Sequence, residues 1–306
     1  MAKRLKLYNN SIEYQIDKNT AGFTQYLPNA VYCIADKLSF YNNVSTSQQG
    51  NIEYDERQYI DFEDAEVKRL CAINFGDYRQ TITTDNGDNT VTITEKYKSK
   101  GLSDEIISTT TREITPEDIA GTVNTPIGVT YKQAAAVTSI GTIFQSNTTI
   151  RKFNEFQYFT HVTSLSNNAF NGSGIAQITF PTSLRTIGSG NYSNVFLTCY
   201  NLTKMILNEG VTSVADHWVW GSKNITLIDF PSTIIAMSGY GIHPYDSTQK
   251  NFNIICRAVN PPALGSSNYL TKLIKVYVPD DSVTAYKAAS VWSDIASKIV
   301  GLSTYQ

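Results

Sequence analysis

A short pattern recurs through the second half of the chain and limits the folds that the chain can adopt. The stretch ITFPTSL at 178–184 returns as IDFPSTI at 228–234, and MILNEGV at 205–211 carries the same apolar rhythm between them. The three copies start at 178, 205 and 228, so they are 27 and 23 residues apart. Periods of roughly 20–30 residues are typical of solenoids. The sequence therefore predicts a stack of repeats with a loop of variable length.

Each repeat contributes one short strand with an apolar side. Ile178 and Phe180 alternate along such a strand and face the same way. The proline that follows has no N–H for the sheet ladder, so it ends the strand. One repeat cannot bury its apolar side alone, whereas stacked neighbours build a continuous core. We therefore expect Ile178, Met205 and Ile228 to line up in successive layers.

Apolar and polar residues alternate at 5–8, at 12–16 and in the threonine-rich run that starts at residue 80, and two β-rich runs lie within 31–41. With the repeats, these segments predict a mainly β fold with minor α, of the α+β class. Residues 1–58 are expected to be a β-strand attachment segment, and 59–136 a small α/β module with a three-stranded insertion at 79–114. Residues 137–306 are expected to be the solenoid, closed by a cap helix at 282–300.

Local signals place further elements in the module. Asp61 or Asp64 can cap a helix that ends at Gly76. Asn86-Gly87 lies between threonine-rich alternating runs, which is a strong hairpin signal. The segment TPED at 115–118 has the cap, proline and acidic residue of a short helix.

Composition and charge exclude several classes of protein. Asn, Thr, Ser and Tyr are abundant and charged residues make up only 17%, which is typical of β-rich extracellular and virion proteins. A net charge of −2 gives no field for nucleic acid. The chain has no apolar run long enough to span a membrane, and its charged start lacks the apolar region of a secretory signal peptide. We expect no nucleic-acid partner and no membrane insertion.

No residue pattern predicts catalysis or a metal site. Three histidines, His161, His217 and His243, lack a nucleophile motif around them. Asp216 precedes His217, but side chains of adjacent residues rarely point together. The segment TDNGDN at 84–89 lacks the ligand spacing of a calcium loop. The sequence therefore predicts a protein that is not an enzyme and has no catalytic, cofactor-binding or metal-binding residues.

Cysteines and clustered carboxylates have structural interpretations. The cysteines are scattered without a CxxC pair, so we expect buried thiols, although disulfides stay open. The carboxylates have no apolar pocket around them in the sequence, so we expect a solvated face and no acid–base pair. The cysteines are Cys33, Cys71, Cys199 and Cys256. The clustered carboxylates are Glu53, Asp55, Glu56, Asp61, Glu63 and Asp64.

Aromatic residues in the variable halves of the repeats are the candidate ligand or partner surface. Flat amphipathic rings suit a protein or glycan ligand. Alternatively, about half of them fill the core, with Trp218 at the place of a repeat phenylalanine. The candidates are Tyr192, Tyr200, Trp218, Trp220, Tyr240, Tyr245 and Tyr269.

The repeats resemble those of the BspA-like leucine-rich repeat family. LSNNAFNGSGIAQITFP at 165–181 fits the family pattern, as does WVWGSKNITLIDFP at 218–231, with Trp218 or Val219 in place of the phenylalanine. The ending also resembles the family's usual one, in NIICRAVNPPAL and VYVPDDSVTAYKAASVWSDIASKI. Upstream, EVKRLCAINFG and TYKQAAAV resemble a module that precedes such repeats in gut Bacteroides proteins and their phages. The three-stranded insertion stands where that module carries a calcium-type loop.

This resemblance implies a non-enzymatic virion structural and recognition protein of a crAss-like phage: a head fibre, capsid decoration or tail-associated protein. Because no leader is evident, we expect assembly in the host cytoplasm; a bacterial cell-surface adhesin is the alternative. Expected partners are other virion proteins through the N-terminal region, further copies of the chain, and a host surface protein or glycan. A hydrolase in 1–130 is a third class.

Overall fold

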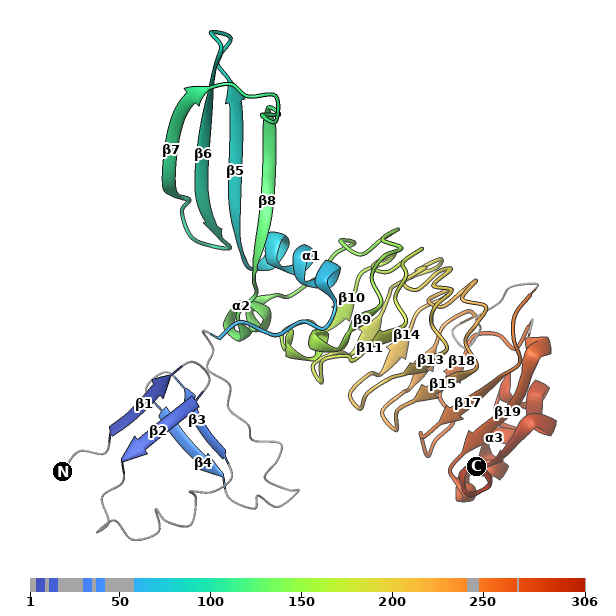
Figure 1. Cartoon of the computed structure of the whole chain (residues 1–306). Coiled ribbons are helices and arrows are strands. Elements are labelled where there is room, and N and C mark those ends of the chain that lie inside the picture. Colours follow the sequence, from blue (N-terminus) through green and yellow to red (C-terminus); the bar gives the residue numbers. More distant parts are fainter. Residues whose placement is uncertain are drawn as a thin grey trace. The chain divides into compact units, whose positions relative to one another are not determined.

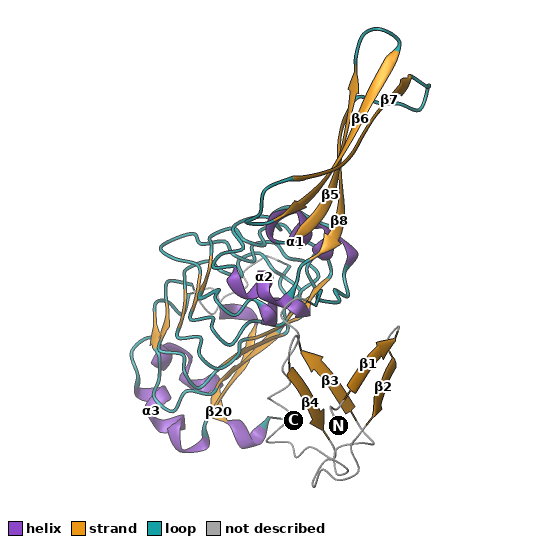
Figure 2. Cartoon of the chain, turned by 90° about the vertical axis from the view of Figure 1, so that its left-hand side faces the viewer, coloured by secondary structure: helices purple, strands orange, loops and turns teal. Residues whose placement is uncertain are grey.

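The computed structural model covers the whole chain and describes residues 58–240, 248–268 and 270–305, together with the backbone of four N-terminal strands (Figure 1). The chain divides into two compact units, residues 1–59 with 130–132 and residues 60–129 with 133–306. The second unit contains both the α/β module and the solenoid. Figure 2 shows that strands and loops predominate and helices are few.

The first unit contains two antiparallel hairpins. The segments predicted as strands from their alternation are strands, and Cys33 lies in one of them, with its side chain outside the described atoms. The pairs are β1 (Arg4–Tyr8) with β2 (Ser11–Gln15), and β3 (Ala30–Ile34) with β4 (Lys37–Tyr41).

Helix α1 (Ala65–Phe75) opens the second unit and confirms the predicted capping. Asp64 is the N-cap, and Gly76 follows the last turn. Val67 and Cys71 are fully buried on one side of the helix. Of the two proposed caps, Asp64 is therefore the one that satisfies the N–H groups of the first turn.

A four-stranded antiparallel sheet follows, in the order β7-β6-β5-β8. The Asn86-Gly87 hairpin is confirmed, and Gly87 has the positive φ of +76° that favours glycine. The predicted helix at 115–118 is wrong, because Asp118 accepts hydrogen bonds from the Thr115 N–H and hydroxyl and from Arg112, which closes a turn. The strands are β5 (Asp77–Asp85), β6 (Thr90–Ser99), β7 (Glu105–Glu113) and β8 (Gly121–Gly128).

The fourth strand, β8, is absent from the sequence prediction. Its sequence GTVNTPIG contains glycine, asparagine and proline, which are all poor strand formers. It lies at the sheet edge, where a proline is tolerated. Helix α2 (Tyr131–Ala136) follows and then the chain enters the solenoid.

The solenoid is built from turns of chain, here called coils, each of which adds short strands to parallel sheets. One five-stranded sheet aligns a buried apolar residue from every coil. Its strands are β10 (Ser164–Leu165), β12 (Thr186–Ile187), β14 (Ser213–Val214), β16 (Ala236–Met237) and β18 (Ala263–Leu264), and the aligned residues are Leu165, Ile187, Val214, Met237 and Leu264.

A second five-stranded sheet confirms most of the predicted layering. Met205 is the register partner of Ile228, and the column continues through Ile254, Val276 and Ile299. All five residues are buried. The strands are β13 (Lys204–Ile206), β15 (Leu227–Phe230), β17 (Phe252–Cys256), β19 (Leu273–Val278) and β20 (Ile299–Gly301).

Ile178 departs from the predicted column. Its strand β11 (Gln177–Ile178) pairs with β9 (Lys152–Phe153) and is not hydrogen-bonded to β13. An open cavity of about 520 Å³ borders both β11 and β13. Ile178 is therefore only half-buried, although it occupies the same repeat position as Met205.

A stack of phenylalanine rings fills the core beside the sheets. The Phe170 ring lies 5.2 Å from that of Phe144 and 5.0 Å from that of Phe196, with planes within 4° in both pairs. Two residues before Phe170 and Phe196, Asn168 and Asn194 have left-handed backbones.

Of the two residues expected in place of the repeat phenylalanine, Trp218 and Val219, the structure places Val219 there. The next left-handed residue in the same series is His217, which places Val219 in the phenylalanine position. Trp218 lies one residue earlier, where the preceding coils have Ala169 and Val195. Trp218 and Val219 are both fully buried. A large and a small residue have therefore exchanged places, which preserves the volume of the core.

The C-terminal cap is two short helices, whereas the sequence predicted one helix over 282–300. Helix α3 (Val283–Ala288) ends at an extended Ala289, and η6 (Trp292–Lys298) begins after Val291, whose φ is +67°. The break lets two side chains six residues apart reach the last coil. Tyr286 donates its hydroxyl hydrogen to Ala258 O, and Trp292 Nε1 donates to Pro262 O.

Asp64 also joins α1 to the first coils of the solenoid. One carboxylate oxygen accepts from the N–H groups of Glu66 and Val67, at 3.0 and 3.1 Å. The other accepts from the N–H groups of Arg151 and Lys152, at 2.6 and 3.2 Å. The expectation of a solvated carboxylate face is wrong here, because this carboxylate is half-buried and occupied on both oxygens.

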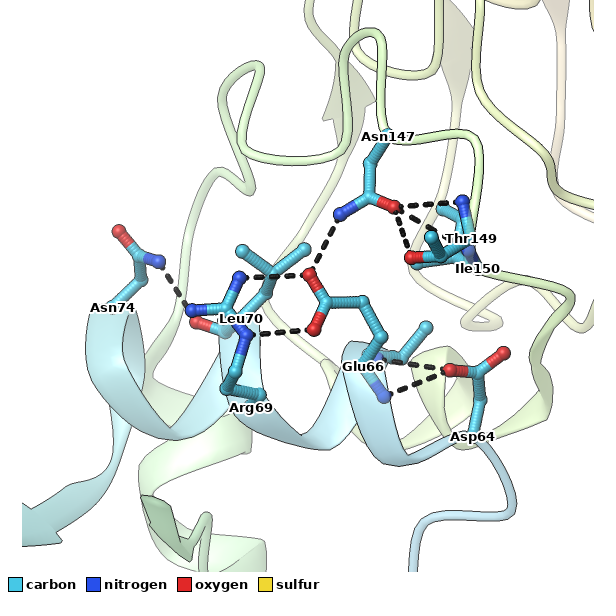
Figure 3. Close-up of polar contacts among 9 residues, drawn as sticks. Asp64, Glu66, Arg69, Leu70, Asn74, Asn147, Thr149 and Ile150 are labelled. Atoms are coloured by element: carbon cyan, nitrogen blue, oxygen red, sulfur yellow. Dashed lines mark hydrogen bonds and ion pairs between the residues drawn. The ribbon is translucent and has the colours of Figure 1, made fainter. Parts of the chain in front are cut away.

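Neighbouring side chains extend this junction (Figure 3). Glu66 accepts from Asn147 Nδ2 at 2.8 Å and pairs with Arg69 at 2.6 Å. The Asn147 oxygen in turn accepts from the Thr149 N–H and hydroxyl. The helix thus caps the open end of the stack, as terminal elements of a solenoid must.

Stability should depend on pH through this junction. Burial alone would raise the pKa of Asp64, but four backbone hydrogen bonds, led by that from Arg151, outweigh it and lower the pKa. A carboxyl with a lowered folded pKa stabilises the fold above its unfolded pKa of about 4, and this stabilisation is lost as pH falls through the folded pKa. In urea titrations, we expect the stability difference between wild type and Asp64→Ala to shrink below about pH 4. A difference that stays constant to pH 2 would contradict this assignment.

Candidate functional site

Four aromatic side chains from successive coils form one group, here called the aromatic cluster: Tyr192, His217, Trp220 and Tyr240. The His217 ring is central, with ring centroids 4.6 Å from Tyr192, 4.4 Å from Trp220 and 5.2 Å from Tyr240. Trp220 and Tyr240 also contact each other, at 5.4 Å. The histidine is buried, whereas 68% of Tyr192 is exposed. The cluster therefore has a buried ring at its base and one aromatic ring that is accessible to a ligand.

Asp216 fixes the base of the cluster. Its Oδ2 atom lies 2.7 Å from His217 Nδ1, so the expectation that these adjacent side chains point apart is wrong. Its Oδ1 atom accepts from the Tyr240 N–H at 2.8 Å. Gly239 allows this approach, because a Cβ there would lie 2.3 Å from Oδ1. The buried carboxylate therefore joins two coils and lies against the histidine ring, whose Nδ1 atom is buried without a hydrogen-bond partner.

The backbone turns sharply at two cluster residues. Tyr192 and His217 have φ values of +55° and +58°, in the left-handed region that such residues rarely adopt. The Asp216 carbonyl accepts from the Ser193 N–H at 3.0 Å and from its hydroxyl at 2.6 Å. These bonds stabilise the unfavourable backbone and fix where the two rings point. Strained residues of this kind often accompany binding sites.

His217 replaces an asparagine of the repeat. Asn168 and Asn194 occupy the equivalent left-handed positions in the preceding coils, where asparagine is favoured. The segments NAF, NVF and HWV align at 168–170, 194–196 and 217–219. The sequence therefore contained a signal for His217, namely a residue that departs from the repeat at a position that needs a special backbone.

The other predicted surface residues lie apart from this cluster or outside the described residues. Tyr200 is 46% exposed and lies under Lys223, whose Nζ is 4.9 Å from the ring centroid. Trp218 belongs to the core. Tyr245 and Tyr269 lie outside the described residues. The structure thus brings Tyr192, Trp220 and Tyr240 together and adds His217 and Asp216 to them.

The remaining titratable candidates that the structure describes are not grouped into a second site. His161 Nδ1 contacts the Ala135 carbonyl, and His243 lies outside the described residues. Cys71, Cys199 and Cys256 are buried free thiols, and burial raises the pKa of Cys199 and of Cys256 to about 11. Among the described residues, no three His, Cys, Asp or Glu side chains are grouped as metal ligands would be.

Within the described ranges, no helix has both the length and the apolar character needed to cross a bilayer.

Comparison with known proteins identifies the repeats. Residues 132–243 match the family model for the BspA type leucine-rich repeat region, in six copies. This stretch contains all three coils that contribute to the cluster, and the two ladders of strands continue beyond it to β18 and β20. No curated protein matches the chain.

Proposed function

Because residues 132–243 are a BspA-type leucine-rich repeat region, we propose that this chain is a non-enzymatic recognition protein. Repeat regions of this type generally serve binding to proteins or surfaces. The observation that carries the proposal is the exposed Tyr192 ring, packed on a buried histidine that lies 2.7 Å from the Asp216 carboxylate. Rigid aromatic anchors of this kind dominate binding energies. The ligand would be a protein or glycan on a cell surface.

The more specific form of this proposal is a virion component of a Bacteroides-infecting phage, in a head fibre, capsid decoration or tail. It rests on the resemblance of the module and repeats to such proteins. In this form the N-terminal segment 1–58 attaches to other virion proteins, several copies assemble, and the solenoid presents the cluster to the host. The alternative is a bacterial cell-surface adhesin.

Binding should depend on the exposed ring of the cluster. We expect Tyr192→Ala to weaken binding of the full chain to its target cells at least tenfold, since hot-spot aromatic residues contribute about 2 kcal/mol or more. Binding of labelled protein to intact cells of a panel of gut Bacteroides strains measures this. Tyr305→Ala is the matched control, because Tyr305 is also an exposed ring packed on a neighbour, Tyr277. Equal binding by both variants and wild type would contradict the proposal.

Particle composition distinguishes the two forms of the proposal. Quantitative mass spectrometry of purified phage particles should find the chain in a fixed ratio to the major capsid protein. Recovery only in a bacterial envelope fraction would instead support the adhesin.

A further inference from the structure

We propose that the ligand of the aromatic cluster is a carbohydrate, a pyranose ring that packs on Tyr192 and donates a hydroxyl hydrogen to His217 Nε2. This inference rests on the proposed function and specifies the ligand class for the same site. Three properties of the cluster support it. They are the favoured tautomer of His217, the accessibility of its Nε2 atom, and the lack of a positively charged side chain among the cluster residues.

The Asp216 carboxylate favours one of the two neutral tautomers of His217. The Asp216 Oδ2 atom lies 2.7 Å from His217 Nδ1, but the angle does not make a hydrogen bond, and Nδ1 is buried without a hydrogen-bond partner. A negative charge at this distance still disfavours a lone pair on Nδ1 relative to an N–H group. The neutral imidazole has one N–H and one acceptor nitrogen, so a proton on Nδ1 leaves the Nε2 lone pair free to accept. The dyad therefore presents a hydrogen-bond acceptor in a fixed direction.

This acceptor is open to a ligand. His217 is only 8% exposed, yet Nε2 is not among the buried polar atoms that lack a partner. In the described part of the chain, no protein group donates a hydrogen bond to Nε2. The atom thus contacts solvent at the edge of a buried ring, where a ligand hydroxyl can replace water.

The rings favour a ligand with apolar faces and polar edges. Tyr192 offers an exposed aromatic face, on which the C–H groups of a pyranose pack well. None of the four described residues of the cluster is a lysine or arginine, so the cluster itself offers no cation to an anionic ligand. A purely apolar peptide anchor would leave Nε2 buried without a donor, which costs about 1–3 kcal/mol. A sugar satisfies both the ring face and the acceptor.

Titration of the full chain with free methyl pyranosides tests this inference. The panel contains the methyl pyranosides of glucose, galactose, mannose and N-acetylglucosamine. Binding is measured by ligand-observed NMR and by tryptophan fluorescence. We expect saturable binding of at least one member. We also expect a deoxy analogue, lacking the donated hydroxyl, to bind at least tenfold more weakly, because a site built for a hydroxyl rejects its absence.

Two variants locate the hydroxyl contact. His217→Phe keeps an aromatic ring but removes the acceptor, so the parent sugar and its deoxy analogue should bind this variant equally. Asp216→Asn keeps an oxygen for the Tyr240 N–H and removes the negative charge beside Nδ1, so it should reduce the preference for the hydroxyl. Tyr305→Ala should prefer the parent sugar over its deoxy analogue to the same extent as wild type.

Each outcome bears on the inference separately from the proposed function. If no pyranoside saturates the protein while cell binding persists and is sensitive to Tyr192→Ala, the ligand is a protein and the carbohydrate inference is overturned. The inference would also be overturned if His217→Phe still bound the parent sugar more tightly than its deoxy analogue, to the same extent as wild type. Loss of cell binding by wild type itself would remove the proposed function.

Discussion

Replacing Phe170 with alanine is expected to lower the free energy of unfolding by about 3–5 kcal/mol. The side chain is fully buried and stacks between Phe144 and Phe196, each about 5 Å away with nearly parallel planes. Its removal leaves a cavity between three coils that short strands and ladder bonds hold in place. Because coils contact only their neighbours, the loss of stability should be largest in the adjoining coils.

Urea unfolding of the full chain measures this effect, and hydrogen exchange identifies the coils that open. Phe170→Leu is the matched control: it keeps an apolar side chain of similar size, so we expect a loss of about 1–1.5 kcal/mol. A loss below 1 kcal/mol for Phe170→Ala, or faster exchange confined to β5–β8, would show that the phenylalanine stack does not hold the solenoid together.

The second large effect is expected at the start of the solenoid. Asp64→Ala removes the cap of α1, worth about 1 kcal/mol. It also removes two charge-assisted bonds from Arg151 and Lys152 N–H groups, and bonds to charged groups contribute about 1.5–3 kcal/mol when they are well formed. Allowing for partial exposure of the carboxylate, we expect a total loss of about 2–4 kcal/mol.

Asp61→Ala is the control for this variant, since Asp61 is an exposed carboxylate three residues earlier. Surface substitutions of this kind change stability by about 0.5 kcal/mol or less. Asp64→Asn keeps an acceptor for α1 but loses the charge, so it should fall between Asp61→Ala and Asp64→Ala. If Asp61→Ala and Asp64→Ala had equal free energies of unfolding, the proposed stabilising role of Asp64 at the junction would be refuted.

The elements that could be predicted from the sequence are those with local signals. The repeats, the Asp64 cap and the Asn86-Gly87 turn each depend on residues close together in the chain, and they are confirmed. Strand β8 and the break in the cap helix depend on distant contacts instead. Pairing with β5 imposes the strand on a sequence with low β propensity, and the core positions of Tyr286 and Trp292 interrupt the helix.

The candidate site was predicted only in part. Tyr192, Trp220 and Tyr240 could be selected because aromatic residues in variable halves of repeats are unusual. Their grouping depends on how coils stack, which varies with loop length. The sequence does not point to His217, because adjacent side chains usually diverge, yet in the structure its left-handed backbone places Nδ1 close to Asp216. Comparing repeats position by position would have identified it as the replacement for Asn168 and Asn194.

Hydroxyl-radical footprinting of the full chain, free and bound to intact target cells, tests most directly whether recognition occurs at the aromatic cluster. We predict that binding protects Tyr192 and Trp220 from oxidation, while Tyr305 reacts equally in both states. Protection confined to other residues, with Tyr192 oxidised as fast in the bound protein as in the free protein, would contradict recognition through the cluster.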